Sequence, residues 1–546
     1  MRDRVAASLV LLAGALSGCF SGSSSPAEQP PEPGTDAETT PTIDAMALDA
    51  GTVDATMAMA TEAGLPEAAP EAAVEAGPAP VTVTIVNHLG PEPGVLIAFQ
   101  DVTGHVVATG TTNALGQVTE LLDTATQVTA VMGSSPPIQY TSESIPVRVD
   151  GVTLEAGVGD AGVGDGGPAA IPAPTDIQIV TVQGVEPGDS LSLVDPSDTT
   201  FSNATVVVDS LPDAAPPPNT ESYAVQIGDC YDYYASFPTS IYLTQDCEAN
   251  GVFPVLVTAL GGEGSVPIGY TWQNGNTIPL DGGVAHVAMS GPWVTAFSSD
   301  SIAAQNVPFV GNQYVTYGEI TDGVSTSSTT YVTADDAGDG LSAFTGHPGF
   351  APAVQNEVMV SSNGDGWISV SAIATRAPFA ADGGASFDLS TALPLINAYT
   401  IDAGASSDDA GGPEQPYVGW ATDAGSLASA SGVAVQINWN WSGPGIYGYG
   451  TWTIVAPPTA TSVTAPMLPP QVAGWAPNAN SYIETPPTIL VAQSSSLPTY
   501  AAFRSQFATL PATQAVLNGN YNNSPTIPPL PANGTVRVSG IVSPGG

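Results

Sequence analysis

The chain has 546 residues, with 6 basic residues, all of them arginine, against 51 acidic residues, and a formal net charge of -45. Only 10% of its residues are charged, so this net charge reflects a shortage of bases more than an excess of acids. So few arginines exclude electrostatic binding to DNA or RNA, and 59 glycines with 51 prolines exclude a long helical bundle.

The first residues have the pattern of an export signal. A short basic start precedes an apolar run over 5–16, which is too short for the roughly 20 residues that cross a bilayer. The run ends in Leu16-Ser17-Gly18-Cys19, which resembles the lipobox of bacterial lipoproteins. The resemblance implies that 1–18 is a signal peptide and that Cys19 is acylated. It also implies a membrane partner through the lipid anchor, and a location at the bacterial outer membrane or cell surface. An ordinary secretory signal with a chance cysteine is the alternative.

The stretch after the signal has the composition of a tether. Residues 21–80 are rich in Ala, Pro, Glu, Thr and Ser and contain no basic and no aromatic residue. Such a segment cannot bury enough apolar surface to offset the entropy of ordering. We therefore expect 19–80 to be a lipidated, disordered acidic linker.

Short alternating segments with turn residues between them follow, and they predict a β-sandwich over 81–155. The predicted strands are 81–86, 95–101, 105–112, 117–122 and 127–132. An apolar strand is followed by an Asp101-x-x-Gly104 turn, a second strand and a Thr112-Asn113-x-x-Gly116 turn. This order of strands and turns resembles the carboxypeptidase-regulatory-like (transthyretin-like) domain. Asn113 stands where that family usually has aspartate. The resemblance implies a small non-catalytic module that spaces or displays other modules.

Acidic glycine-rich stretches interrupt the chain at 156–175, 335–340 and 402–412. These Asp-Ala-Gly patches resemble low-complexity loops that are common in secreted proteins of myxobacteria. They are candidates for calcium binding, but solvated loops are the interpretation that the composition favours. We expect 156–175 to be a linker.

The rest of the chain also alternates with period two and predicts strands. We expect a β-sandwich over 176–308, a β-rich domain over 309–456 and a proline-rich segment over 457–546 that packs on a preceding domain. One short helix is predicted over 499–510. The predicted fold class is all-β, with tandem β-sandwich domains after the disordered acidic tether.

The remaining two cysteines, Cys230 and Cys247, form an even pair in a chain that carries an export signal. Their separation is not the Cys-x-x-Cys of a redox-active pair. We therefore predict a structural disulfide.

A search for catalytic motifs finds none. The four histidines lack metal-ligand spacing, and no nucleophile elbow, zinc-protease helix or phosphate-binding loop occurs. We predict no catalytic residue and no enzyme activity. A hydrolase that uses two unidentified carboxylates remains an alternative, because any two acids in a cleft could serve.

A weak candidate metal site lies at Ser361-Ser362-Asn363-Gly364-Asp365-Gly366. Asn363 and Asp365 could bind Ca²⁺ as part of a calcium loop, but two of its usual carboxylate ligands are missing. A tight hairpin turn is the interpretation that the sequence favours. No other cofactor is expected.

A weak candidate ligand site is the aromatic hairpin that contains Trp439, Trp441, Tyr447 and Tyr449. If exposed, these rings would form a platform on which sugar rings stack. If buried, they would be the core side of a hairpin, with Gly448 and Gly450 allowing close approach, and the pattern favours the core.

Together these features predict a lipid-anchored surface protein with a non-catalytic structural or adhesion-type role. A surface glycan-binding protein that uses the aromatic hairpin is the alternative. A surface glycan or another protein is the expected partner, and nucleic acid is not.

Overall fold

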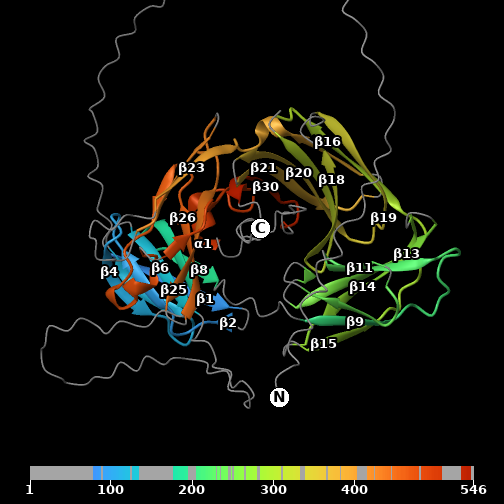
Figure 1. Cartoon of the computed structure of the whole chain (residues 1–546), viewed down its shortest axis with the longest axis horizontal. Coiled ribbons are helices and arrows are strands. Elements are labelled where there is room, and N and C mark those ends of the chain that lie inside the picture. Colours follow the sequence, from blue (N-terminus) through green and yellow to red (C-terminus); the bar gives the residue numbers. More distant parts are fainter. Residues whose placement is uncertain are drawn as a thin grey trace, which may run out of the picture. The chain divides into compact units, whose positions relative to one another are not determined.

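The computed structural model (Figure 1) gives the positions of most residues after 77. The described residues are 78–87, 90–122, 126–133, 176–194, 204–228, 230–233, 235–243, 247–248, 251–262, 266–279, 283–308, 311–332, 339–364, 367–380, 383–402, 415–422, 425–443, 446–478, 481–506 and 530–542. The predicted signal peptide, the 156–175 linker and the tether up to residue 77 lie outside these ranges. The expected end of the tether at residue 80 is slightly late, because residues 79 and 80 already belong to a strand.

The first sandwich has two four-stranded layers. One layer contains β1 (Ala79–Asn87), β2 (Gly90–Pro91), β5 (Gln117–Leu122) and β8 (Ser190–Val194). The other contains β3 (Leu96–Gln100), β4 (Val106–Thr111), β6 (Thr126–Gly133) and β7 (Asp176–Val185). Alternate apolar residues of both layers meet in one core, including Val83, Phe99 and Leu191.

The expected domain boundary at 176 is wrong. Strand β7 pairs antiparallel with β6, and β8 pairs in parallel with β1. The short helix α1 (Tyr500–Gln506) contacts the segment that joins β7 to β8. The Tyr500 hydroxyl donates to the Gln183 carbonyl at 2.6 Å, and Arg504 forms an ion pair with Asp189 at 2.7 Å. The first sandwich therefore extends to residue 194.

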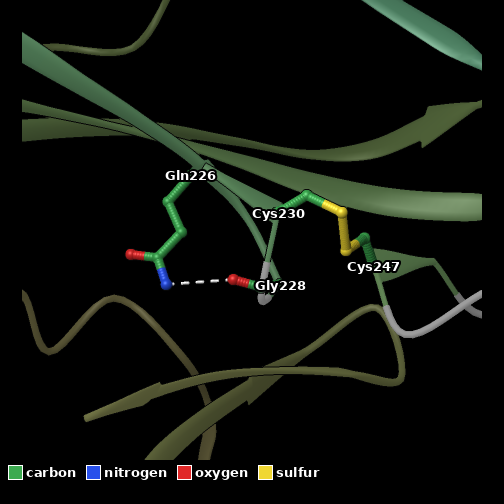
Figure 2. Close-up of a disulfide and its surroundings, with 4 residues drawn as sticks. All are labelled: Gln226, Gly228, Cys230 and Cys247. Carbon is green, nitrogen blue, oxygen red and sulfur yellow. Dashed lines mark hydrogen bonds between the residues drawn. A yellow bond between two sulfur atoms is a disulfide. The ribbon is translucent and has the colours of Figure 1, made fainter. Parts of the chain in front are cut away.

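The second sandwich lies over 204–289. One sheet contains β9 (Thr205–Ser210), β12 (Thr239–Tyr242) and β15 (Val284–Ala288). The other contains β10 (Ser222–Ile227), β11 (Cys230–Tyr233), β13 (Val252–Gly261) and β14 (Val266–Thr277). The predicted disulfide is confirmed: Cys230 and Cys247 are bonded, with 5.7 Å between their Cα atoms (Figure 2). Figure 2 also shows the Gln226 amide donating to the Gly228 carbonyl at the turn before Cys230.

The third sandwich begins earlier than expected. Its smaller sheet contains β16 (Ser298–Gln305), β19 (Gly340–His347) and β22 (Gly384–Asp388), and it packs on β17 (Asn312–Thr321), β18 (Val324–Val332), β20 (Ala353–Gly364) and β21 (Trp367–Pro378). The expected boundary at 308 is wrong, because β16 lies before it and pairs only with β19 and β22. Its Ile302 and Ala304 are buried, whereas serines dominate the rest of the strand.

The fourth core lies between another small sheet and the C-terminal strands. The small sheet contains β23 (Ile396–Asp402), β24 (Tyr417–Thr422) and β27 (Ser462–Thr464). It faces β25 (Gly432–Gly443), β26 (Ile446–Ala456), β28 (Ser481–Ile483), β29 (Thr488–Ser494) and β30 (Thr535–Val542). The 3-10 helix η3 (Pro470–Trp475) packs in this core, whereas Leu389 of the 3-10 helix η2 (Leu389–Thr391) packs in the core of the third sandwich. The segment 457–546 thus supplies strands to this core, so the expected boundary at 456 does not separate two folding units.

One hydrogen-bonded sheet of thirteen strands passes through three of these cores. Its order is β18-β17-β20-β21-β30-β29-β25-β26-β7-β6-β3-β4, with β28 beside β25. The all-β prediction is confirmed, but the sandwiches are not independent units in a row, since three of them share this sheet. Within the part of the chain described here, no helix is long and apolar enough to cross a membrane.

Candidate functional site

The pairing of β25 with β26 divides the predicted aromatic platform between two faces. Trp439 lies opposite Gly450, and Trp441 lies opposite Gly448, whereas Asn440 lies opposite Tyr449. Side chains of directly paired residues share one face of a sheet, and successive residues alternate faces. The tryptophans therefore share a face with the glycines, and Tyr449 shares the other face with Asn440.

The tryptophan face belongs to the core. Trp439 is 1% exposed and packs in the fourth core, and the half-buried Trp441 packs against the same core. A Cβ atom on Gly450 would overlap the Trp439 indole, and one on Gly448 would overlap that of Trp441. The glycines thus leave space for the indoles, as the core interpretation requires. The interpretation of all four aromatic residues as one exposed platform is wrong.

The opposite face carries exposed tyrosines. Tyr449 of β26 is 54% exposed, and Tyr482 of β28 is 67% exposed. Both are paired with Asn440 of β25, which lies between them. We call Tyr449, Asn440 and Tyr482 the tyrosine row. The side chain of Tyr447 lies outside the described residues, although its backbone pairs with that of Ser442.

Amides and carboxylates border the tyrosine row. The Asn440 amide donates to the Glu484 carboxylate at 3.2 Å. On the other side, Asp176 of β7 is paired with Tyr449, and the Gln178 amide donates to the Asp176 carboxylate at 3.0 Å. This face therefore offers hydrogen-bonding groups beside aromatic rings, and two of these groups, Glu484 and Asp176, are acidic.

The sequence analysis identified Tyr449 and missed Tyr482 and Glu484. Both lie in the proline-rich segment, which was not expected to contain strands. The alternation in Ser481-Tyr482-Ile483-Glu484 was the signal that could have identified a strand there.

The strands on both sides of the candidate calcium loop pair with each other, as the hairpin interpretation expects. Asn363 pairs with Ile368 and Gly364 pairs with Trp367, so two residues connect β20 to β21. Asp365 and the side chain of Asn363 lie outside the described residues. Among the residues whose positions the structure gives, no three His, Cys, Asp or Glu side chains form a group that could hold a metal ion. Calcium binding at this turn stays a prediction, and so does acylation of Cys19, which lies outside the described ranges.

A buried carboxylate that the sequence analysis missed lies in the third sandwich. Glu319 is 2% exposed and accepts hydrogen bonds from the His347 ring at 3.0 Å and from the Gly349 and Phe350 amides at 2.7 and 2.8 Å. Burial raises the pKa of the neighbouring Tyr317, and the negative charge of Glu319 raises it further. Both oxygens of Glu319 are engaged in fixing the loop between β19 and β20, which indicates a structural role.

A cavity of about 350 Å³ lies where the β26–β27 connection approaches the end of β24. Its described lining is neutral and includes Trp420, Thr422, Leu427, Pro458 and Thr461. These lining residues include no pair of acids for glycoside hydrolysis.

Comparisons with known proteins assign no family. No family model matches the chain, and no curated protein matches it. Among solved structures, the TIE protein of Bacillus anthracis is similar over 57% of this chain and 50% of its own, with 7% identity and a TM-score of 0.12. This chain thus spans half the length of that protein.

A streptococcal ancillary pilin is similar over 51% of this chain and 89% of its own, with 8% identity and a TM-score of 0.12. The alpha-2-macroglobulin of E. coli is similar over 74% of this chain and 26% of its own, with 9% identity and a TM-score of 0.09. Similarity at these TM-scores carries no information about function.

Proposed function

We propose that this chain is a lipid-anchored, non-catalytic protein of the bacterial cell surface with a structural or adhesion-type role. The lipobox-like Leu16–Cys19 supports the anchor. The disulfide between Cys230 and Cys247 supports an oxidising compartment outside the cytoplasm.

The continuous sheet is the observation that carries the proposed role. Strand β7 pairs with β26, and β30 lies between β21 and β29, so residues hundreds of positions apart share one ladder of hydrogen bonds. The pairs β7–β26 and β21–β30 thus join neighbouring cores through backbone hydrogen bonds. A rigid β scaffold of this kind suits the display of a binding face at the end of a tether.

The resemblance of the first sandwich to the carboxypeptidase-regulatory-like domain fits a role in spacing or display. Its two signature turns are formed by Asp101 with Gly104 and by Asn113 with Gly116. The Asn113 side chain accepts from the amides of Leu115 and Gln117, much as Asp101 accepts from those of Thr103 and His105. Asn113 therefore makes in its turn the hydrogen bonds that Asp101 makes in the other turn.

Substitution of the lipidated cysteine tests the proposal. The wild-type chain, Cys19→Ser and the nearby control Ser21→Ala are expressed in a bacterial host, and membrane and released fractions are quantified. We expect the wild type and Ser21→Ala in the membrane fraction and Cys19→Ser in the released fraction. Protease added to intact cells should digest the anchored chain if it is displayed at the surface. Retention of Cys19→Ser in the membrane would contradict the proposal.

A second candidate function is glycan binding. The observation that favours it is the tyrosine row, which places two exposed aromatic rings on a rigid sheet beside hydrogen-bonding groups.

A further inference from the structure

The tyrosine row differs from the glycan platform that the sequence suggested, both in its residues and in the face on which it lies. We propose that Tyr449 and Tyr482, with Asn440, Glu484 and Asp176 around them, bind a neutral polysaccharide. This inference deepens the proposed surface role and rests on it.

The spacing of the two rings fits a chain of sugars. Tyr449 in β26 and Tyr482 in β28 are each paired with Asn440 in the strand between them. Two strand spacings separate their Cα atoms by about 10 Å. This separation is larger than a single sugar ring needs, so the two tyrosines would stack on separate units of one extended ligand.

The sheet fixes the backbone positions from which both rings project before a ligand arrives. β25 pairs with β26 over eleven residues without a register shift and also pairs with β28. Tyrosine offers a large, amphipathic contact surface that loses little side-chain entropy when it is immobilised. The tyrosine row is therefore preorganised, as a binding site on a rigid sheet should be.

Polar groups on this face can satisfy sugar hydroxyls. The carboxylates of Glu484 and Asp176 accept hydrogen bonds, and the Gln178 amide can both donate and accept. The Asn440 amide nitrogen donates, whereas its oxygen is buried. These groups lie on both sides of Tyr449 and Asn440, so hydroxyls along the edge of a sugar chain would meet partners on either side.

Charge selects against acidic ligands. The chain carries a formal net charge of -45, and the charged residues around the tyrosine row, Asp176 and Glu484, are both acidic. An anionic polysaccharide would be repelled by this field, whereas a neutral one would not. Binding driven by stacking and neutral hydrogen bonds should also change little with salt concentration.

The experiment uses the full chain with Cys19→Ser, so that the protein can be purified without lipid. Affinity electrophoresis measures retention of the protein by each polysaccharide and the dissociation constant of the complex. The panel contains neutral glucans, galactans and mannans, with polygalacturonate and alginate as anionic members. The variants are Tyr449→Ala, Tyr482→Ala and their combination. Tyr231→Ala is the matched control, because Tyr231 is 61% exposed on β11 in the second sandwich.

We expect retention by at least one neutral polysaccharide, independent of salt, with each single substitution weakening binding about tenfold. Tyr231→Ala should bind like the parent protein. Retention by none of the neutral polysaccharides, a preference for anionic ones, or equal loss in Tyr231→Ala would overturn the proposal. A dimer that Tyr482→Ala dissociates in sedimentation equilibrium would also overturn it, because the row would then be a contact between two copies.

Two further measurements separate this inference from the proposed function. Unchanged thermal unfolding of the tyrosine variants shows that lost binding is not lost folding. Surface display of the lipidated wild type and of the double variant is measured on cells. If both are displayed but neither binds a glycan, the binding site fails and the surface role stands. If neither is displayed, the surface role itself fails.

Discussion

At the scale of single residues, one hairpin serves both the core and the surface because its side chains alternate. Trp439 and Gly450 form one packed pair on the buried face, while Asn440 and Tyr449 form the next pair on the opposite face. The sequence predicted the strands and the close approach of the glycines. It could not assign the tyrosines to a face, because the register of the hairpin decides which residues are opposite one another.

We expect Trp439→Ala to lower the free energy of unfolding by about 3–5 kcal/mol, because it removes a fully buried indole and leaves a cavity. Tyr449→Ala should change it by no more than about 0.5 kcal/mol, since its ring is mostly exposed. Urea titration followed by fluorescence measures both. A larger effect for Tyr449→Ala than for Trp439→Ala would contradict the assignment of the two faces.

The buried carboxylate of Glu319 supports a second prediction. In Glu319→Gln, a carboxylate that accepts several N–H groups becomes an amide whose own N–H₂ faces those donors. We expect the free energy of unfolding to fall by about 1–3 kcal/mol. Amide hydrogen exchange at Gly349 and Phe350 should become faster. Glu484→Gln, at a half-buried surface position, is the control and should leave stability unchanged within error. Unchanged exchange in Glu319→Gln would show that the carboxylate does not fix this loop.

At the scale of elements, sequence patterns predicted the apolar strands and missed the polar ones. The predicted strand over 117–122 corresponds to β5, and the helix predicted over 499–510 begins as α1 at Tyr500. Strand β16 was missed because its sequence, SSDSIAAQ, contains few apolar residues. On both sides it pairs through backbone hydrogen bonds with strands that are distant in sequence, β19 and β22. Such pairing overrides weak local propensity.

Strand β8 gives a direct test of the corrected boundary. Leu193 is buried in the first sandwich, so Leu193→Asp would place an unpaired charge in that core. We expect loss of hydrogen-exchange protection in 79–133 and none in 204–289. Ser192→Asp, at a half-buried neighbouring position, is the control. Loss of protection confined to 204–289 would restore the boundary at 176.

The turn between β3 and β4 should be sensitive to acid. Hydrogen bonds from the Thr103 hydroxyl and from the His105 and Thr103 amides hold the pKa of Asp101 below its usual 3.8. A lowered folded-state pKa means that the carboxylate stabilises the turn above pH about 4 and loses this effect as the pH falls through the lowered value.

Amide exchange at Thr103 and His105 should therefore accelerate below pH 4 relative to exchange at Leu115 and Gln117, after correction for intrinsic rates. The second pair is the control, because Asn113 makes the equivalent turn with an amide that does not titrate. Equal acceleration in both turns would contradict this account.

At the scale of the whole molecule, long-range pairing determines the architecture. Strands β7 and β26 are neighbours although 260 residues lie between them in the sequence, and β30 completes the sheet between β21 and β29. Alternation of apolar and polar residues indicates that a segment is a strand, but it does not specify the partner of that strand. This is why the sequence predicted an all-β chain and a disulfide but placed the boundaries of its sandwiches incorrectly.

The anchor is the central claim of this account, because the proposed role depends on display at the cell surface. The most direct measurement is mass spectrometry of the protein purified from membranes, after cleavage behind glutamate to release the peptide over 19–28. We predict a mature chain that begins at Cys19, with this peptide carrying the added mass of two or three acyl chains. A mature chain that begins elsewhere, or an unmodified Cys19 in the membrane-bound protein, would contradict the claim.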